Sequence, residues 1–284
     1  MMRTLQARPK PGPVFAADDV ATSANVVLAL SRDLVPAGLV RRISQSESGE
    51  RLWWVGSEPL VVLEEYGVDI PTWQRLLEES GLLIRAYHST RARDARVFRQ
   101  TGIKPLDPDE LYGRVRSKVL GRASGYELPP DRWVEFVAWS KTEHPIDGKL
   151  CLSKGPFLFL SRCVMDDPVM TKPHLHGPEF EEDLFRLLET FCDQEGLPRP
   201  DQYSEVLLRG TRGIILHCDI PFHRLDGRPR RSVLKLVAET LFKNEALADA
   251  EAHHTWLCLC LEEGVPPEWI SKVEYVTGVL GETP

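Results

Sequence analysis

Short apolar runs scattered between helical segments of unequal length are the feature that most constrains this chain. The runs 82–88, 157–162, 213–220 and 255–262 each have about the length of one buried strand. The helical segments between them do not alternate with the strands in the regular way that builds a parallel α/β sheet. The pattern therefore predicts an α+β fold with mixed or antiparallel sheets.

The clearest helix in the sequence covers Phe180–Gln194. Phe180, Leu184, Leu187, Leu188 and Phe191 recur at the spacing of one helical face, which predicts a single buried stripe. Other helices are expected over 59–66, 72–79 with Thr72 as its cap, 109–120 and 233–242, and other strands over 51–55, 149–153, 205–209 and 272–276. The stretch 25–34 fits a strand or a short helix, and 121–148 is expected to be irregular with Trp133 and Trp139 as core candidates.

Composition limits the classes of function. The chain has 284 residues, of which 42% are hydrophobic, so it can bury an ample core. Its 35 basic and 42 acidic side chains give a net charge of −7, which argues against a general binder of phosphate backbones. No apolar run approaches the ~18 residues of a membrane span, and the N-terminal residues lack the apolar core of a signal peptide. We therefore expect a cytoplasmic chain without a membrane partner, whose six cysteines are reduced structural thiols.

Changes in composition along the chain suggest its domain organisation. Residues 1–24 are rich in proline, alanine and aspartate without periodicity, and we expect a loose arm there. Residues 25–80 are expected to form a small N-terminal subdomain. Residues 81–284 are expected to form the main domain.

His88 is the first candidate for a functional residue. It stands at the end of the run 82–88 and is followed by the hydroxyl side chains of Ser89 and Thr90. An imidazole in this place can form a hydrogen bond with a ribose hydroxyl. The alternative is a core histidine bonded to a backbone carbonyl. Thr90 can also cap a short helix that ends at Gly102, because glycine readily adopts a positive φ.

Two glutamates are candidates for a working carboxylate. Glu179 stands at the start of the helix 180–194, where the partial positive charge of the helix favours an anion. It either caps this helix or polarises a ribose hydroxyl and stabilises an oxocarbenium-like transition state. Glu205 is the second candidate, and its alternative is an exposed charge on a strand.

A metal site is a further interpretation of the histidines. His174 and His176 form an H-x-H pair, which projects both rings to one side of an extended chain. His217, Cys218 and His223 are suitable ligand types, but no standard spacing connects them to the pair. We therefore expect no metal.

Several segments carry a resemblance to a known family. They are Tyr87-His88-Ser89-Thr90 with the following Thr101-Gly102-Ile103-Lys104-Pro105, then Gly155-Pro156-Phe157-Leu158-Phe159-Leu160-Ser161, then His174-Leu175-His176-Gly177-Pro178-Glu179. The first resembles the opening strand and helix of the ADP-ribosyltransferase-like fold, and the second resembles its second conserved strand. The third is similar to a G-x-E segment found in bacterial members of this group. The ADP-ribosyltransferase-like fold is the catalytic fold of mono-ADP-ribosyltransferase toxins, PARP-type enzymes and RNA 2′-phosphotransferases. The resemblance covers roughly 82–280.

The resemblance implies an architecture and a site. It implies two small mixed or antiparallel sheets that form a split ADP-ribosyltransferase-like core within 81–284, with an N-terminal α/β appendage. It implies NAD as the substrate, with His88 on the adenosine ribose and with Ser89 and Thr90 at the strand end. Phe157, Phe159 or Ser161 would stand where the family often has a tyrosine that stacks on nicotinamide. Glu179, with Glu205 in reserve, would be the catalytic carboxylate.

The function expected from this resemblance is NAD-dependent transfer of ADP-ribose with release of nicotinamide. The sequence leaves open whether the acceptor is a protein, a nucleic acid or a small molecule, and it leaves the oligomeric state open. One alternative is a non-enzymatic interaction or regulatory module on the same fold with a degraded site. Another is an enzyme similar to RNA 2′-phosphotransferases, against which the net charge of −7 counts.

Overall fold

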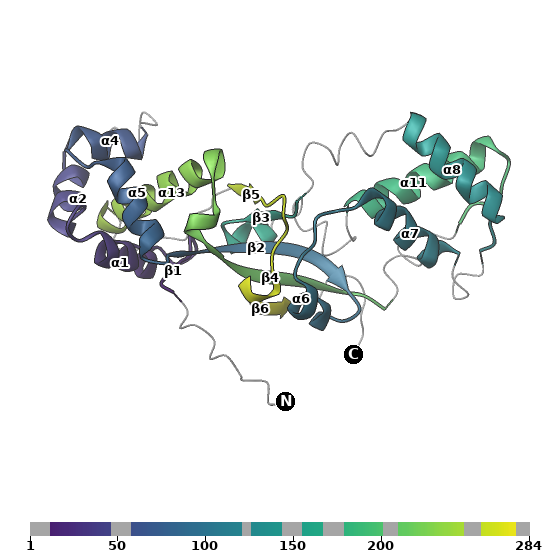
Figure 1. Ribbon diagram of the computed structural model, residues 1–284, viewed down its shortest axis with the longest axis horizontal. Helices are drawn as coiled ribbons and strands as arrows, with labels where there is room; N and C mark the ends of the chain where they lie inside the picture. Colours follow the sequence, from purple (N-terminus) through teal and green to yellow (C-terminus); the bar gives the residue numbers. More distant parts are fainter. Residues whose placement is uncertain are drawn as a thin grey trace, which may run out of the picture. The chain divides into compact units, whose positions relative to one another are not determined.

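One six-stranded sheet contains all the strands in the described part of the chain (Figure 1). The computed structural model describes residues 12–46, 58–120, 126–143, 155–166, 179–200, 210–246 and 257–276. The strands are β1 (Val14–Phe15), β2 (Leu83–Ala92), β3 (Phe157–Phe159), β4 (Arg212–Pro221), β5 (Cys258–Cys260) and β6 (Ile270–Tyr275). Together with the helices they form an α+β fold, which confirms the predicted class.

The sheet has the strand order β5-β3-β2-β4-β6, with β1 paired to β2 beside this path. β1 runs parallel to β2, whereas the pairs β2–β3, β3–β5 and β4–β6 are antiparallel. A single sheet thus replaces, within the described residues, the two small sheets that the sequence predicted. The physical reason is that β2 and β4, each ten residues long, are neighbours in the order. The short strands β3 and β6 pair with the outer sides of these two strands, so all of them belong to one sheet.

The helices differ from the sequence prediction at a few places. They are α1 (Val20–Ser31), α2 (Ala37–Ser44), α4 (Pro59–Glu65), α5 (Ile70–Glu79), α6 (Arg96–Thr101), α7 (Pro108–Val119), α8 (Pro130–Glu143), α11 (Glu179–Gln194) and α13 (Gly227–Ala246), with 3-10 turns η1 (Arg162–Asp166), η2 (Phe222–Arg224) and η3 (Pro267–Trp269). The stretch 25–34 is helical as far as Ser31, where α1 ends, and α8 occupies a stretch for which the sequence predicts irregular structure. None of the helices in the described ranges combines the length and the apolar character needed to cross a bilayer.

The chain divides into two compact units, each built from two separate parts of the sequence. The units comprise 1–85 with 219–257, and 86–218 with 258–284. The sequence had placed 219–257 with the rest of a domain beginning at residue 81. The structure assigns this segment to the first unit because α13, which lies within it, packs against α1, α2 and α4.

In the first unit, buried polar contacts accompany the apolar packing. The indole N–H of Trp73, a fully buried residue of α5, donates a hydrogen bond to Ser31 Oγ at 2.7 Å. α5 begins with Asp69, whose carboxylate accepts the amide hydrogen of Thr72. The sequence predicted Thr72 as the cap of this helix. Its hydroxyl instead donates to Asp69 at 2.7 Å, so the aspartate is the cap.

In the second unit, α7, α8 and α11 share one apolar core. The stripe predicted for α11 is confirmed, with Leu184, Leu188 and Phe191 buried and with Phe180 and Leu187 packed partly buried against the same core. These side chains occupy one face of α11, so the helix faces its partners along its whole length.

α8 brings both predicted core tryptophans into this cluster. Trp133 is buried and Trp139 is half-buried, and their ring centroids lie 5.1 and 6.5 Å from that of Phe136. Trp133, Phe136 and Ser140 have helical spacing and face the same side. This local pattern could have predicted the helix that the sequence analysis missed.

The segment after β2 also differs from expectation. Thr90 was expected to begin a helix, but β2 continues through Ala92 and α6 starts only at Arg96. Gly102 ends α6 as predicted, with φ of +72°. A Cβ at this glycine would lie 2.1 Å from the carbonyl oxygen of Val265, so both the backbone conformation and the close approach require glycine.

Gly155 offers a test of backbone packing beside β3. A Cβ built there would lie 1.9 Å from the carbonyl oxygen of Leu261. We expect Gly155→Ala to lower the free energy of unfolding by about 2–3 kcal/mol, because backbone must shift to admit the methyl group. The matched control is Gly113→Ala in α7, where no atom lies within 4 Å of the added carbon. This control should gain about 0.5–1 kcal/mol from its higher helix propensity. Denaturant unfolding followed by tryptophan fluorescence measures both, and equal effects would contradict the prediction.

Candidate functional site

Three of the predicted site residues, His88, Ser89 and Thr90, lie inside β2. Successive side chains of a strand point to opposite faces of its sheet. His88 and Thr90 therefore share one face, and Ser89 projects to the other together with Tyr87. The structure does not bring the three predicted residues together around one ligand position.

The pairing of β3 with β2 determines which residue of β3 lies on the same face of the sheet as His88. Tyr87 is the cross-strand partner of Phe159, and such partners project to the same face. Phe157 and Phe159 therefore lie on the Tyr87 face, opposite to His88. The β3 residue on the His88 face is Leu158, which is fully buried. Sequence analysis missed Leu158, because period-two alternation places it on a face only once the partner of β3 is known.

The ring of His88 is held neutral, with Nδ1 as a hydrogen-bond donor and Nε2 as an acceptor. Its Nδ1 lies 2.9 Å from the carbonyl oxygen of Phe157 and donates to it, since a carbonyl can only accept. Burial lowers the pKa of His88 below 6.5, and the bond to the Phe157 carbonyl opposes this shift in part. With the proton on Nδ1, the lone pair is on Nε2, which has no partner within the described part of the chain. The bond to Phe157 matches the alternative interpretation, a histidine bonded to a backbone carbonyl, and the contact with a ribose hydroxyl stays a prediction.

The other predicted residues on and after β3 have structural surroundings. Phe157 is 44% exposed, whereas Phe159 packs partly buried against the cluster of Tyr87, Met165 and Ile215. The hydroxyl of Ser161 is buried, with its Oγ 2.7 Å from Cys163 Sγ. Neither Phe157 nor Phe159 lies on the His88 face of the sheet, and Ser161 follows the end of β3.

Of the two predicted carboxylates, only Glu179 belongs to a helix that the structure describes. Glu179 is the first residue of α11, in agreement with the expected helix start. Its side chain, the whole of Glu205 and the H-x-H pair of His174 and His176 lie outside the described residues. Among the residues that are described, no group of three or more histidine, cysteine, aspartate or glutamate side chains is arranged to bind a metal ion.

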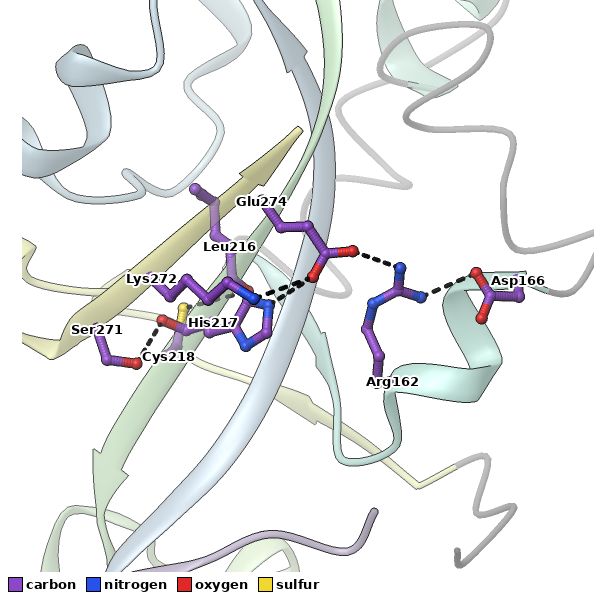
Figure 2. Close-up of polar contacts among 8 residues, drawn as sticks. All are labelled: Arg162, Asp166, Leu216, His217, Cys218, Ser271, Lys272 and Glu274. Atoms are coloured by element: carbon purple, nitrogen blue, oxygen red, sulfur yellow. Dashed lines mark hydrogen bonds and ion pairs between the residues drawn. The ribbon is translucent and has the colours of Figure 1, made fainter. Parts of the chain in front are cut away.

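A charged cluster around Glu274 was not predicted (Figure 2). Its carboxylate accepts from Arg162 Nη2 at 2.6 Å and from His217 Nε2 at 2.9 Å, and Lys272 Nζ lies 3.7 Å away. Arg162 also bonds Asp166 at 2.9 Å. The cluster joins η1, β4 and β6, which are far apart in sequence, so no local spacing signals it.

The electrostatics of this cluster indicate a structural clamp. The hydrogen bond from Arg162 lowers the pKa of Glu274 to about 2, with burial opposing the shift and His217 adding to it. The carboxylate is therefore ionised near neutral pH and is already shared by two donors. The ring of His217 meets that of Tyr87 edge to face at 5.0 Å, which places the cluster on the side of β2 opposite to His88.

Comparison with known proteins identifies no relative, since no family model, curated protein or solved structure matches the chain. The site is therefore defined by its own geometry. That geometry separates an acceptor nitrogen of His88 on one face of β2 from the Glu274 clamp on the other.

The Glu274 clamp should stabilise the fold in a pH-dependent way. The folded state lowers the pKa of this carboxyl, so its contribution is present above the ordinary value near 4.5 and is lost as the pH falls toward 2. We expect Glu274→Gln to lower the free energy of unfolding by about 1–3 kcal/mol at pH 7 and by much less at pH 3. The control is Glu268→Gln, which changes an exposed carboxylate of η3 in the same unit. Urea denaturation at both pH values tests this, and a loss independent of pH would contradict it.

The protonation of His88 gives a second test. We expect its ring to titrate below pH 6.5 in histidine NMR spectra, with the signal assigned from its absence in His88→Gln. Because the fold disfavours the charged ring, the wild-type protein should lose stability as the pH falls through 6.5, and His88→Gln should lose less. Titration of His88 above 6.5 would show that the ring is not held neutral.

Proposed function

We propose that the chain binds NAD and transfers its ADP-ribose group to an acceptor, with release of nicotinamide. The observation that carries this proposal is the state of His88, whose Nδ1 is fixed on a carbonyl while Nε2 remains an acceptor. The order of the segments that resemble the ADP-ribosyltransferase-like fold supports it. Nicotinamide adenine dinucleotide offers ribose hydroxyls that such a nitrogen can bind.

In this proposal His88 binds the adenosine ribose. A ribose hydroxyl donates its hydrogen to Nε2, an orientation that requires the neutral imidazole. The lowered pKa of His88 favours this form at neutral pH. Thr90 lies two residues further along β2 on the same face, and in this proposal it would line the same ribose.

Glu179 is the proposed catalytic carboxylate, with Glu205 as the second candidate. The carboxylate would accept a hydrogen bond from the 2′-hydroxyl of the nicotinamide ribose and stabilise the positive charge that develops at the anomeric carbon. As the bond between this carbon and the nicotinamide nitrogen breaks, its electron pair neutralises the pyridinium ring. The acceptor then bonds to the anomeric carbon and loses its proton. The acceptor can be a protein, a small molecule or a nucleic acid, and the net charge of −7 disfavours the last.

A second candidate function is a non-enzymatic interaction module. The observation that favours it is the placement of Phe157 and Phe159 on the face of β2 opposite to His88, with Leu158 on the His88 face. The aromatic side chains expected near a nicotinamide ring are therefore separated from the proposed ribose acceptor. Such a chain would keep the fold without turning over NAD.

Binding and turnover of NAD distinguish these functions. A ligand that binds only the folded chain stabilises it by about 2.7 kcal/mol at a hundredfold excess over its Kd, which raises Tm by several degrees. We expect this rise for the wild-type chain with millimolar NAD, together with release of nicotinamide. His88→Ala should weaken Kd about 3- to 10-fold through loss of one hydrogen bond. His223→Ala, which changes an exposed histidine of η2, is the control and should leave Kd unchanged.

The carboxylate is tested separately from binding. Glu179→Gln should keep the rise in Tm with NAD but lower the rate of nicotinamide release about 10²- to 10³-fold, the usual effect of losing one electrostatic stabiliser. Full turnover by this variant would move the role to Glu205 or remove it. No change in Tm and no turnover of the wild-type chain would refute the transferase and favour the interaction module.

A further inference from the structure

Glu181, in the first turn of α11, is a buried carboxylate that none of the roles above uses. Its side chain is only 3% exposed, although it lies two residues from the start of the helix. A buried carboxylate costs much free energy unless a cation and hydrogen bonds compensate it. The first turn of α11 must therefore stay in a position where a cation neutralises the carboxylate of Glu181.

The compensating cations come from α7. Lys118 Nζ lies 2.6 Å from Glu181 Oε2, and Arg114 Nη1 lies 3.8 Å from Glu181 Oε1. Lys118 is the stronger partner, because it is closer and its side chain is 28% exposed against 47% for that of Arg114. The pair of Lys118 and Glu181 thus fixes the first turn of α11 against the last turn of α7.

This ion pair is not the only contact between the two helices. Leu184 and Leu188 on α11, together with Leu111 and Val115 on α7, belong to the same buried apolar core. Folding of this bundle therefore does not depend on the ion pair alone. The pair acts at the start of α11, where Glu179 is the first residue.

We propose that Lys118 and Glu181 are a positioning pair that sets the place of Glu179 for the transfer reaction. The inference rests on the proposed function, in which Glu179 must meet the ribose within hydrogen-bond distance. Removing Lys118 leaves the buried carboxylate of Glu181 with only the more distant Arg114, and removing the charge of Glu181 abolishes the ion pair. Either change loosens the first turn of α11 from α7. A displacement of about 1 Å at a reacting group can lower its rate about 10²-fold.

The test compares substitutions at this pair in the full chain, with nicotinamide release from NAD as the readout. Glu181→Gln and Lys118→Met should each lower kcat about 10- to 100-fold and leave the KM for NAD within about twofold. Lys118→Arg keeps the cation and should restore kcat to within about threefold. The matched control is Glu182→Gln, which breaks an ion pair with the exposed Arg186 on the same turn and should leave kcat unchanged.

Further measurements separate positioning from loss of fold. Each variant is assayed at least 10 °C below its own Tm, where a merely structural role would leave kcat intact. The double variant Glu181→Gln with Lys118→Met should be no slower than either single variant, since both charges are then gone. An additive loss in the double variant would count against a shared role.

The inference and the proposed function fail in different ways. If Glu179→Gln is inactive while Glu181→Gln and Lys118→Met turn over NAD at the wild-type rate, the positioning pair is refuted and the transferase stands. If Lys118→Arg is as slow as Lys118→Met, the positioning pair is also refuted. If the wild-type chain releases no nicotinamide, both proposals fall together.

Discussion

The alternation of side chains along β2 governs how the site is arranged. Tyr87 and His88 are neighbours in the chain, yet they belong to opposite faces of the sheet. On the Tyr87 face, the tyrosine ring packs edge to face on that of His217, which in turn bonds Glu274. The His88 face carries Leu158 and an imidazole whose Nε2 has no partner among the residues that the structure describes. β2 thus separates the Glu274 clamp, built from η1, β4 and β6, from the hydrogen-bond acceptor of His88.

Two low-exposure carboxylates determine which distant segments meet. Glu274 receives Arg162 across 112 residues, and Glu181 receives Lys118 across 63. Each pair has a separation of 2.6 Å, and the pair of Lys118 and Glu181 joins two helices that also share an apolar core. Because an unpaired buried charge is costly, the contact of Glu181, which is 3% exposed, penalises arrangements of α7 and α11 that separate it from Lys118. This contact therefore adds specificity to a fold whose stability comes mainly from apolar burial.

Features that depend on one element could be predicted from the sequence, whereas features that depend on pairing could not. The stripe of α11 and the apolar run of β2 follow from local periodicity. The placement of Leu158 beside His88 requires the partner of β3, which no local signal gives. Glu274 was missed for the same reason, since Arg162 and His217 reach it from separate segments. The helix α8 is different, because Trp133, Phe136 and Ser140 stand at helical spacing. This local pattern is sufficient to predict a helix there.

The discontinuous first unit has a consequence for how the chain is made. α1, α2 and α4 are synthesised early, but the helix on which they pack, α13, ends only at Ala246. During translation these short helices emerge before α13, so their apolar sides lack this packing partner until α13 has been made. Contacts between such distant segments slow folding and prolong the exposure of hydrophobic surface. The first unit can therefore complete its packing only after α13 has left the ribosome.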